Sequence, residues 1–173
     1  AHKMDSIIFD KTGTITKGKP DVTDIVSFGE DRKEILRISA SVEKTSEHPL
    51  GEAIVKKAEE EGLTLSEAES FSAVPGKGLK ASFEGREILL GNRKLMREND
   101  IDLTDREKDI EKLETEGKTA MILAVDGRLT GIIAVADGIK ETSQAAIREL
   151  QDMGLKVFMI TGDNERTARA IGA

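Results

Sequence analysis

A short polar stretch near the start of the sequence, Asp10-Lys11-Thr12-Gly13-Thr14, combines residue types that phosphoryl chemistry requires. The carboxylate of Asp10 can act as a nucleophile. Gly13 allows backbone N–H groups to come close to a phosphate, whose oxygens can also accept hydrogen bonds from threonine hydroxyls. A single aspartate after a strand more often caps a turn, so the hypothesis depends on the five residues together. They favour a site of phosphoryl transfer over a structural turn.

A second polar stretch, Thr161-Gly162-Asp163-Asn164, stands near the end of the sequence. Each stretch follows a short apolar run, residues 6–9 and residues 157–160, of the kind that forms a parallel strand buried on both faces. In parallel α/β sheets, ligands collect at the carboxyl ends of the strands. The two stretches are therefore expected to share one site, although a Thr-Gly-Asp turn alone is as often an ordinary helix cap.

The sequence between these stretches has a different pattern, in which helices alternate with antiparallel hairpins. Apolar spacing predicts helices around residues 35–42, from Pro49 onward, and over residues 93–98 and 104–116. The two-residue turns Glu84-Gly85 and Asp126-Gly127 each separate two apolar runs, which predicts two hairpins. A final helix over residues 141–153, stopped by Gly154, leads back into the second apolar run.

The predicted fold is therefore α/β, with an antiparallel sheet plus helices inserted into a parallel α/β domain. Residues 1–18 are expected to form the first part of the host domain and residues 19–136 the insertion. Residues 137–173 are then the second part of the host domain.

The composition excludes several classes of function. Lysine and arginine number 26 against 33 aspartates and glutamates, so the 173-residue chain carries a net charge of −7 and is not expected to bind nucleic acid. The lack of cysteine excludes disulfides, thiolate catalysis and cysteine-ligated zinc. No run of about 20 apolar residues, the length that spans a membrane, is present.

The first polar stretch, followed by Ile15-Thr16-Lys17-Gly18, resembles the phosphorylation signature of P-type ATPases. In haloacid-dehalogenase-like phosphatases, which share that fold, a second aspartate usually stands two residues after the nucleophile, where this sequence has Thr12. A carboxylate at that position would activate water against the aspartyl phosphate. Its absence favours a long-lived acyl phosphate, and hence a pump over a phosphatase.

Three weaker motifs in the insertion resemble the nucleotide-binding domain of heavy-metal-transporting P-type ATPases. They are Ser46-Glu47-His48-Pro49, Gly76-Lys77-Gly78 and Gly91-Asn92. Each alone is more often a cap or a turn, so their order after the phosphorylation motif carries the resemblance. It implies that Glu47 and His48 recognise the adenine, and that Gly76 and Gly78 let the backbone approach the nucleotide.

The resemblance also implies the roles of the catalytic residues and the cofactors, ATP and Mg²⁺. Asp10 is expected to be phosphorylated, and Asp10 with the carbonyl of Thr12 is expected to bind Mg²⁺. Lys11 and Thr161 are expected to contact the phosphate, and Asp163 to lie near the ribose. The host domain is then an incomplete haloacid-dehalogenase-like domain, and ATP or ADP is the ligand of the insertion.

The protein implied by the resemblance is an ATP-driven heavy-metal pump, with copper favoured, that lies in a cell membrane and keeps this part in the cytoplasm. Its other parts would be membrane helices, an actuator domain and the remainder of the phosphorylation domain, with a further Lys and a Gly-Asp-Gly…Asn-Asp segment downstream. The chain alone is expected to be a soluble fragment that binds nucleotide and turns over little ATP. Asp137 matches the family's aspartate at the hinge between domains, although Gly138 and Ile139 replace the usual Arg-Pro.

Two alternatives stay open from the sequence. One is a haloacid-dehalogenase-like phosphatase with a cap domain, which the threonine at position 12 disfavours. The other is a noncatalytic module that senses nucleotide.

Overall fold

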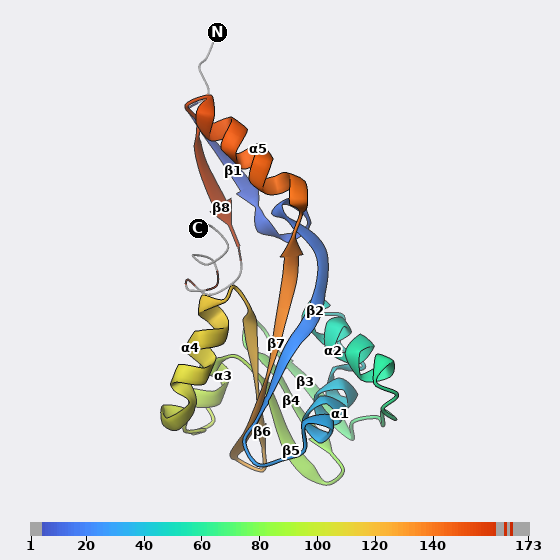
Figure 1. Ribbon diagram of the computed structural model, residues 1–173. Helices are drawn as coiled ribbons and strands as arrows, with labels where there is room; N and C mark the ends of the chain where they lie inside the picture. Colours follow the sequence, from blue (N-terminus) through green and yellow to red (C-terminus); the bar gives the residue numbers. More distant parts are fainter. Residues whose placement is uncertain (1–4, 162–164, 166, 168–173) are drawn as a thin grey trace.

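The computed structural model describes residues 5–161 together with Glu165 and Thr167. Within these residues the chain forms two sheets, one with two strands and one with six. Figure 1 shows the small sheet and α5 at one end of the molecule, and the large sheet with α1 to α4 at the other end. The long strands β2 and β7 run from one end to the other.

The strands are β1 (Ser6–Asp10), β2 (Thr16–Ser27), β3 (Ser70–Val74), β4 (Gly78–Phe83), β5 (Arg86–Gly91), β6 (Thr119–Val125), β7 (Arg128–Ile139) and β8 (Lys156–Ile160). The α-helices are α1 (Arg32–Glu43), α2 (Pro49–Glu60), α3 (Arg93–Arg97), α4 (Glu107–Thr115) and α5 (Glu141–Asp152). Two shorter helical segments are η1 (Lys11–Ile15) and η2 (Thr104–Arg106). The predicted helices and hairpins are confirmed, whereas the sequence pattern predicted neither β2 nor β3.

The large sheet is antiparallel throughout, in the order β2-β7-β6-β5-β4-β3. Alternate residues of its central strands enter two separate cores, as the period of two in a strand requires. In β6, Met121 and Leu123 belong to the core beneath α1 and α2, whereas Ile122 belongs to the core beneath α3 and α4. The continuous apolar run of β6 is therefore explained by helices on both faces of the sheet.

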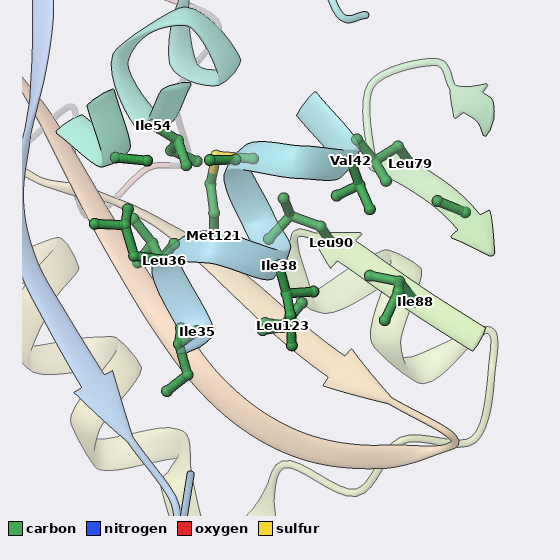
Figure 2. Packing of buried hydrophobic residues seen from close by; sticks show 14 of the residues in the cluster. Ile35, Leu36, Ile38, Val42, Ile54, Leu79, Ile88, Leu90, Met121 and Leu123 are labelled. Atoms are coloured by element: carbon green, nitrogen blue, oxygen red, sulfur yellow. The ribbon is translucent and has the colours of Figure 1, made fainter. Parts of the chain in front are cut away.

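Figure 2 shows the first of these cores, in which side chains of α1 lie against the sheet. Ile35, Leu36 and Ile38 of α1 are fully buried, as are Ile88 and Leu90 of β5. Burying side chains of this size typically stabilises a fold by about 1.5 to 3 kcal/mol each. This packing places α1 and α2 over one face of the sheet.

Both predicted hairpin turns have the backbone geometry that their residues favour. The φ angles are 52° and 71° at Glu84 and Gly85, and 49° and 75° at Asp126 and Gly127. Positive φ at both central residues is the type I′ pattern, whose twist matches that of the flanking strands. The turns therefore set the register of β4 against β5 and of β6 against β7.

The small sheet pairs β1 and β8 in parallel, with Ile8 opposite Phe158 and Asp10 opposite Ile160. The prediction that both strands are buried on both faces is wrong for the described residues, because Ile8 is 60% exposed and Phe158 is 52% exposed. The reason is that the described residues place α5 against one face of this pair and no element against the other (Figure 1). An apolar run in the sequence does not show whether one or both faces of a strand are covered.

The strand β2 pairs antiparallel with β7 from Ser27 opposite Gly131 to Thr16 opposite Ile139. Both strands continue through the predicted domain boundaries after residues 18 and 136, which stay predictions. Two irregularities in the register, between Thr16 and Pro20 and between Val22 and Asp24, bend the ribbon. Across the described residues, no helix combines the length and apolar character needed to cross a membrane.

Candidate nucleotide site

A cleft of about 620 Å³ lies where the six-stranded sheet meets the loops that follow β1 and β8. Its polar walls come from η1, the α1–α2 loop, the β3–β4 turn, the start of α3 and the end of β7. The polar and glycine residues among its lining are Lys11, Thr12, Gly18, Glu43, Ser46, His48, Gly76, Lys77, Gly78, Gly91, Asn92, Gly117, Thr119, Asp137 and Thr161. The volume lies within the range of sites that hold a small organic ligand.

His48 lies on the cleft wall at the start of α2, where it caps the helix. Its ring Nδ1 accepts the backbone N–H of Leu50 at 3.2 Å, and the backbone N–H of His48 donates to Ser46 Oγ at 3.2 Å. A neutral imidazole whose Nδ1 accepts must carry its proton on Nε2. The cap therefore selects the tautomer that offers an N–H donor at the outer end of the ring.

Glu43 is the last residue of α1, and only 3% of its surface is exposed. One carboxylate oxygen, Oε2, has no hydrogen-bond partner. Burial raises the pKa of this carboxyl above its ordinary value, although Ser46 and His48 oppose the shift in part. Gly51 packs directly against it, and a Cβ there would collide with the carboxylate. Glu43 therefore places an acidic group in the cleft wall, with one of its oxygens enclosed beside Gly51.

The β3–β4 turn forms the facing wall and is held by Asn92. The side-chain amide of Asn92 donates to the carbonyl of Gly76 at 2.9 Å, while its oxygen accepts the backbone N–H groups of Lys94 and Leu95 in the first turn of α3. The φ angles of Gly76 and Gly78 are 69° and 135°. A Cβ on Gly78 would collide with the backbone of β5. Glycine is therefore required at position 78 for the turn to lie against the sheet.

Apolar side chains form the floor of the cleft between these two walls. Leu50, Phe71, Leu79, Met121 and Val135 all line it, and Phe71 is 39% exposed. An apolar floor flanked by a few polar groups is typical of a site for a small organic ligand or cofactor.

The opposite end of the cleft is lined by Lys11, Thr12 and Thr161. Because β1 and β8 are parallel and Asp10 pairs with Ile160, the residues that follow the two strands lie at the same edge of the small sheet. Asp10 is exposed at this edge and is not among the residues that line the cleft. The cleft thus extends from His48 and Glu43 to the threonine and lysine side chains next to Asp10.

Six predicted residues line this cleft: Lys11, Thr12, His48, Gly76, Gly78 and Thr161. Glu47 is exposed and is not among the lining residues, and Asp163 lies outside the described residues. Glu43 and Phe71 were missed from the sequence. For Glu43 a signal existed, because an acidic residue in the last turn of a helix opposes the helix dipole.

A comparison with protein families matches residues 4–173 to a haloacid dehalogenase-like hydrolase. The chain belongs to the haloacid dehalogenase-like hydrolase family. The fold expected from the phosphorylation motif is therefore confirmed, and the α/β framework around β1 and β8 is the framework of this family.

Relatives within this hydrolase family are heavy-metal pumps. A copper-exporting P-type ATPase of Staphylococcus aureus is 53% identical over 171 residues, which cover 98% of this chain and 21% of that protein. The crystal structure of a zinc-transporting PIB-type ATPase has a TM-score of 0.71 at 35% identity and covers 98% of this chain and 28% of its own. The N-domain of HMA8, a copper-transporting P-type ATPase, has a TM-score of 0.55 at 30% identity and covers 67% of this chain and 98% of its own.

These comparisons confirm the resemblance to heavy-metal P-type ATPases that the motifs indicated. The chain spans about a fifth of the length of the curated relatives it matches. The metal that those relatives transport is therefore a property of longer proteins.

Hard oxygen donors are available for Mg²⁺ at the edge of the small sheet. They are the carboxylate of Asp10, which is exposed, and the backbone carbonyl of Thr12 in the loop that follows. Mg²⁺ prefers such ligands and keeps several waters, so the two donors fit the ion. Among the described residues, no three His, Asp or Glu side chains gather into a metal-binding group.

Proposed function

We propose that this chain binds an adenine nucleotide in the cleft, as the nucleotide-binding and phosphorylation part of a heavy-metal P-type ATPase. The observation that carries the proposal is the composition of the cleft walls. One continuous surface contains residues of the phosphorylation loop, of the Ser-Glu-His-Pro segment and of the Gly-Lys-Gly turn. These segments are far apart in the sequence and resemble the same family.

The polar groups at the end of the cleft formed by Glu43 and His48 match adenine. Adenine has an exocyclic amino group that donates and ring nitrogens that accept, whereas guanine has an oxygen acceptor in place of that amino group. The carboxylate of Glu43, a residue of the cleft lining, can accept from the amino group, and the Nε2–H of His48 can donate to a ring nitrogen. A guanine oxygen would face the carboxylate acceptor without a proton between them. The cleft is therefore expected to prefer adenine.

The acid that faces the base in this proposal is Glu43, which lies in the cleft, whereas the sequence suggested Glu47. Glu47 is exposed on the same loop. The glycines at positions 76 and 78 leave backbone groups accessible beside the base, as the resemblance implies.

The phosphates would extend toward Lys11, Thr12 and Thr161. In the proposed reaction an oxygen of the Asp10 carboxylate attacks the γ-phosphorus of ATP, the new O–P bond forms, and the bond to the β-phosphate oxygen breaks so that ADP leaves with the electron pair. The Lys11 ammonium would stabilise the charge on the transferred group. Mg²⁺, held by Asp10 and the Thr12 carbonyl, would supply further charge neutralisation when bound.

Transport of a heavy metal, with copper favoured, is the function proposed for the longer protein in a cell membrane, with this part on the cytoplasmic side. The support is the 53% identity with a copper-exporting P-type ATPase. Threonine at position 12 also favours a pump over a phosphatase, because no carboxylate stands two residues after Asp10 to activate water.

Calorimetric titration of the chain with ADP, ATP and GTP tests nucleotide binding. We expect the adenine nucleotides to bind at least about tenfold more tightly than GTP, since mismatched buried hydrogen bonds cost about 1.4 kcal/mol or more. The matched variant His48→Asn keeps a side-chain acceptor for the Leu50 N–H and loses the Nε2–H, so it should weaken ADP binding without loosening α2. Equal affinity for ADP and GTP would contradict the base assignment, and no binding of either at millimolar concentration would contradict the proposed function.

A further inference from the structure

Thr16, directly after the phosphorylation loop, is completely buried although it is polar. It does not line the cleft and takes no part in the proposed phosphoryl transfer. Its hydroxyl lies between three groups: the carboxylate of Asp137, the backbone N–H of Gly13 and the backbone carbonyl of Lys11. These groups belong to the loop that carries Asp10 and to the strand β7.

The hydroxyl has one proton, and the distances indicate where it goes. Thr16 Oγ1 lies 2.5 Å from Asp137 Oδ2 and 3.1 Å from the Lys11 carbonyl oxygen. The Lys11 carbonyl also accepts the backbone N–H of Thr16. The shorter, charge-assisted bond is the stronger one, so Thr16 donates to Asp137. Its lone pair then accepts the N–H of Gly13 at 3.2 Å.

Asp137 is itself fixed by β2. Its Oδ2 accepts the N–H of Gly18 at 3.1 Å, and its Oδ1 accepts the N–H of Lys19 at 3.2 Å. These two residues lie at the irregular start of β2, where the long ribbon joins the small sheet. The position of the Asp137 carboxylate therefore depends on the conformation of the β2–β7 ribbon, which connects the two ends of the molecule.

The phosphorylation loop is held from the other side by the residues that follow β7. Lys140 Nζ donates to the carbonyl of Gly13 at 2.6 Å, and the Lys140 N–H and Ser143 Oγ donate to the carbonyl of Ile15 at 3.0 and 2.8 Å. The peptide groups on both sides of Gly13 are thus fixed, one by Lys140 and one by Thr16. Gly13 has a φ of 75°. The path of the loop before and after Gly13 therefore depends on the hydrogen bonds that its N–H and its carbonyl make with Thr16 and Lys140.

We infer that Thr16 is a positioning residue, whose hydroxyl transmits the geometry of the β2–β7 ribbon through Asp137 to the backbone of the phosphorylation loop. The inference rests on the proposed function in one respect, the identification of that loop as the phosphoryl-accepting loop. Its consequence is that the orientation of Lys11 and Thr12 toward the cleft depends on a hydroxyl outside the cleft.

Two substitutions separate the hydroxyl from the packing of the side chain. Thr16→Val keeps the volume and removes the hydroxyl, whereas Thr16→Ser keeps the hydroxyl and removes the methyl group. Amide hydrogen exchange of the 173-residue chain, followed by NMR, reports on Gly13 directly. We expect exchange of the Gly13 amide to be about tenfold faster in Thr16→Val and close to wild type in Thr16→Ser. The amides of Ile122 and Ile133 in the large sheet report whether each variant is folded.

A merely structural role of Thr16 predicts the reverse order, with Thr16→Ser more perturbed than Thr16→Val. That order, or a Gly13 exchange rate within twofold of wild type in Thr16→Val, would overturn the inference. If Thr16→Val fails to fold, Asp137→Asn serves instead and must accelerate exchange at Gly13, and its failure to do so overturns the inference as well. Titration of the wild-type chain with ADP keeps the two proposals apart, because the exchange rates at Gly13 are measured without nucleotide. A wild-type chain that binds no ADP counts against the proposed function alone.

Discussion

Replacing Glu43 with Gln should stabilise the protein while it weakens nucleotide binding. Glu43 is buried, one of its oxygens has no partner, and burial raises its pKa above the ordinary value of 4.5. The folded state therefore binds the proton more tightly than the unfolded state does. The contribution of Glu43 to stability is most favourable below pH 4.5 and declines as the pH rises toward and through the folded-state pKa.

The size of the effect follows from the burial of an unpaired polar group. Leaving such a group without a partner costs about 1 to 3 kcal/mol, and a charge costs more than a neutral amide. Removing the charge by Glu43→Gln should therefore raise the free energy of unfolding at pH 7.5 by about 1 to 2 kcal/mol. For a chain of this length that corresponds to an increase in Tm of roughly 2 to 8 °C.

Thermal unfolding measured between pH 4 and pH 8 tests this directly. The Tm difference between Glu43→Gln and wild type should be small at pH 4 and grow as the pH rises. Glu114→Gln is the matched control, because Glu114 is also buried but both of its oxygens accept from Arg93. That variant should lower the Tm, since it leaves the arginine without its full partner. A lower Tm for Glu43→Gln at pH 7.5, or a difference that does not depend on pH, would refute the reasoning.

Three further outcomes are expected from single substitutions. His48→Ala should weaken ADP binding more than His48→Asn does, because alanine also removes the cap of α2. Calorimetry should show that the affinity of His48→Ala for ADP is lower than that of wild type by about tenfold or more. An affinity equal to that of wild type would exclude a role for His48. Gly78→Ala should lower the free energy of unfolding by at least about 2 kcal/mol in urea titrations, because the new Cβ meets the backbone of β5, whereas Gly62→Ala, which meets open space, should cost only about 1 kcal/mol. In the longer protein, Asp10→Asn should abolish the acid-stable phosphoenzyme formed from labelled ATP, because an amide is a poor nucleophile; persistent labelling would place the acceptor elsewhere.

The sequence predicted the elements whose residues carry a strong local signal. Asp126-Gly127 and Glu84-Gly85 have the residue types that tolerate positive φ, and the hairpins formed there. The apolar spacing of α1 reflects its contact with the sheet. In these places local preference and tertiary packing agree, so the pattern is sufficient.

The two missed strands lie at the edges of the large sheet. The first turn-like residues of β2 after Thr16 are Lys17, Gly18, Lys19 and Pro20, which have the composition of a loop. An edge strand obtains its hydrogen bonds from one neighbour and leaves much of its surface exposed, so it needs no regular apolar pattern and tolerates proline. β3 is similar, since four of its five residues are exposed. Apolar periodicity therefore could not predict β2, one of the two strands that connect the ends of the molecule.

The candidate site was partly predictable for a related reason. Motifs reveal residues whose type and spacing are unusual, such as the glycines of the β3–β4 turn. Glu43 stands in none of the motifs, and Thr16 belongs to the Ile15-Thr16-Lys17-Gly18 segment without a predicted role of its own. The importance of both comes from burial and from the contacts that they make in the folded chain. Only the folded chain brings Asp137 to Thr16, and only there is the orphaned oxygen of Glu43 apparent.

The central claim is that an adenine nucleotide occupies the cleft with its base between Glu43 and His48. NMR mapping of the isotope-labelled chain with ADP and Mg²⁺ tests it most directly. We predict that the largest shifts occur at His48, Gly76, Gly78 and Asn92, with smaller shifts at Thr12, while the amides of α4 on the far face stay unchanged. Saturation with ADP that leaves the α1–α2 loop and the β3–β4 turn unmoved would contradict the account.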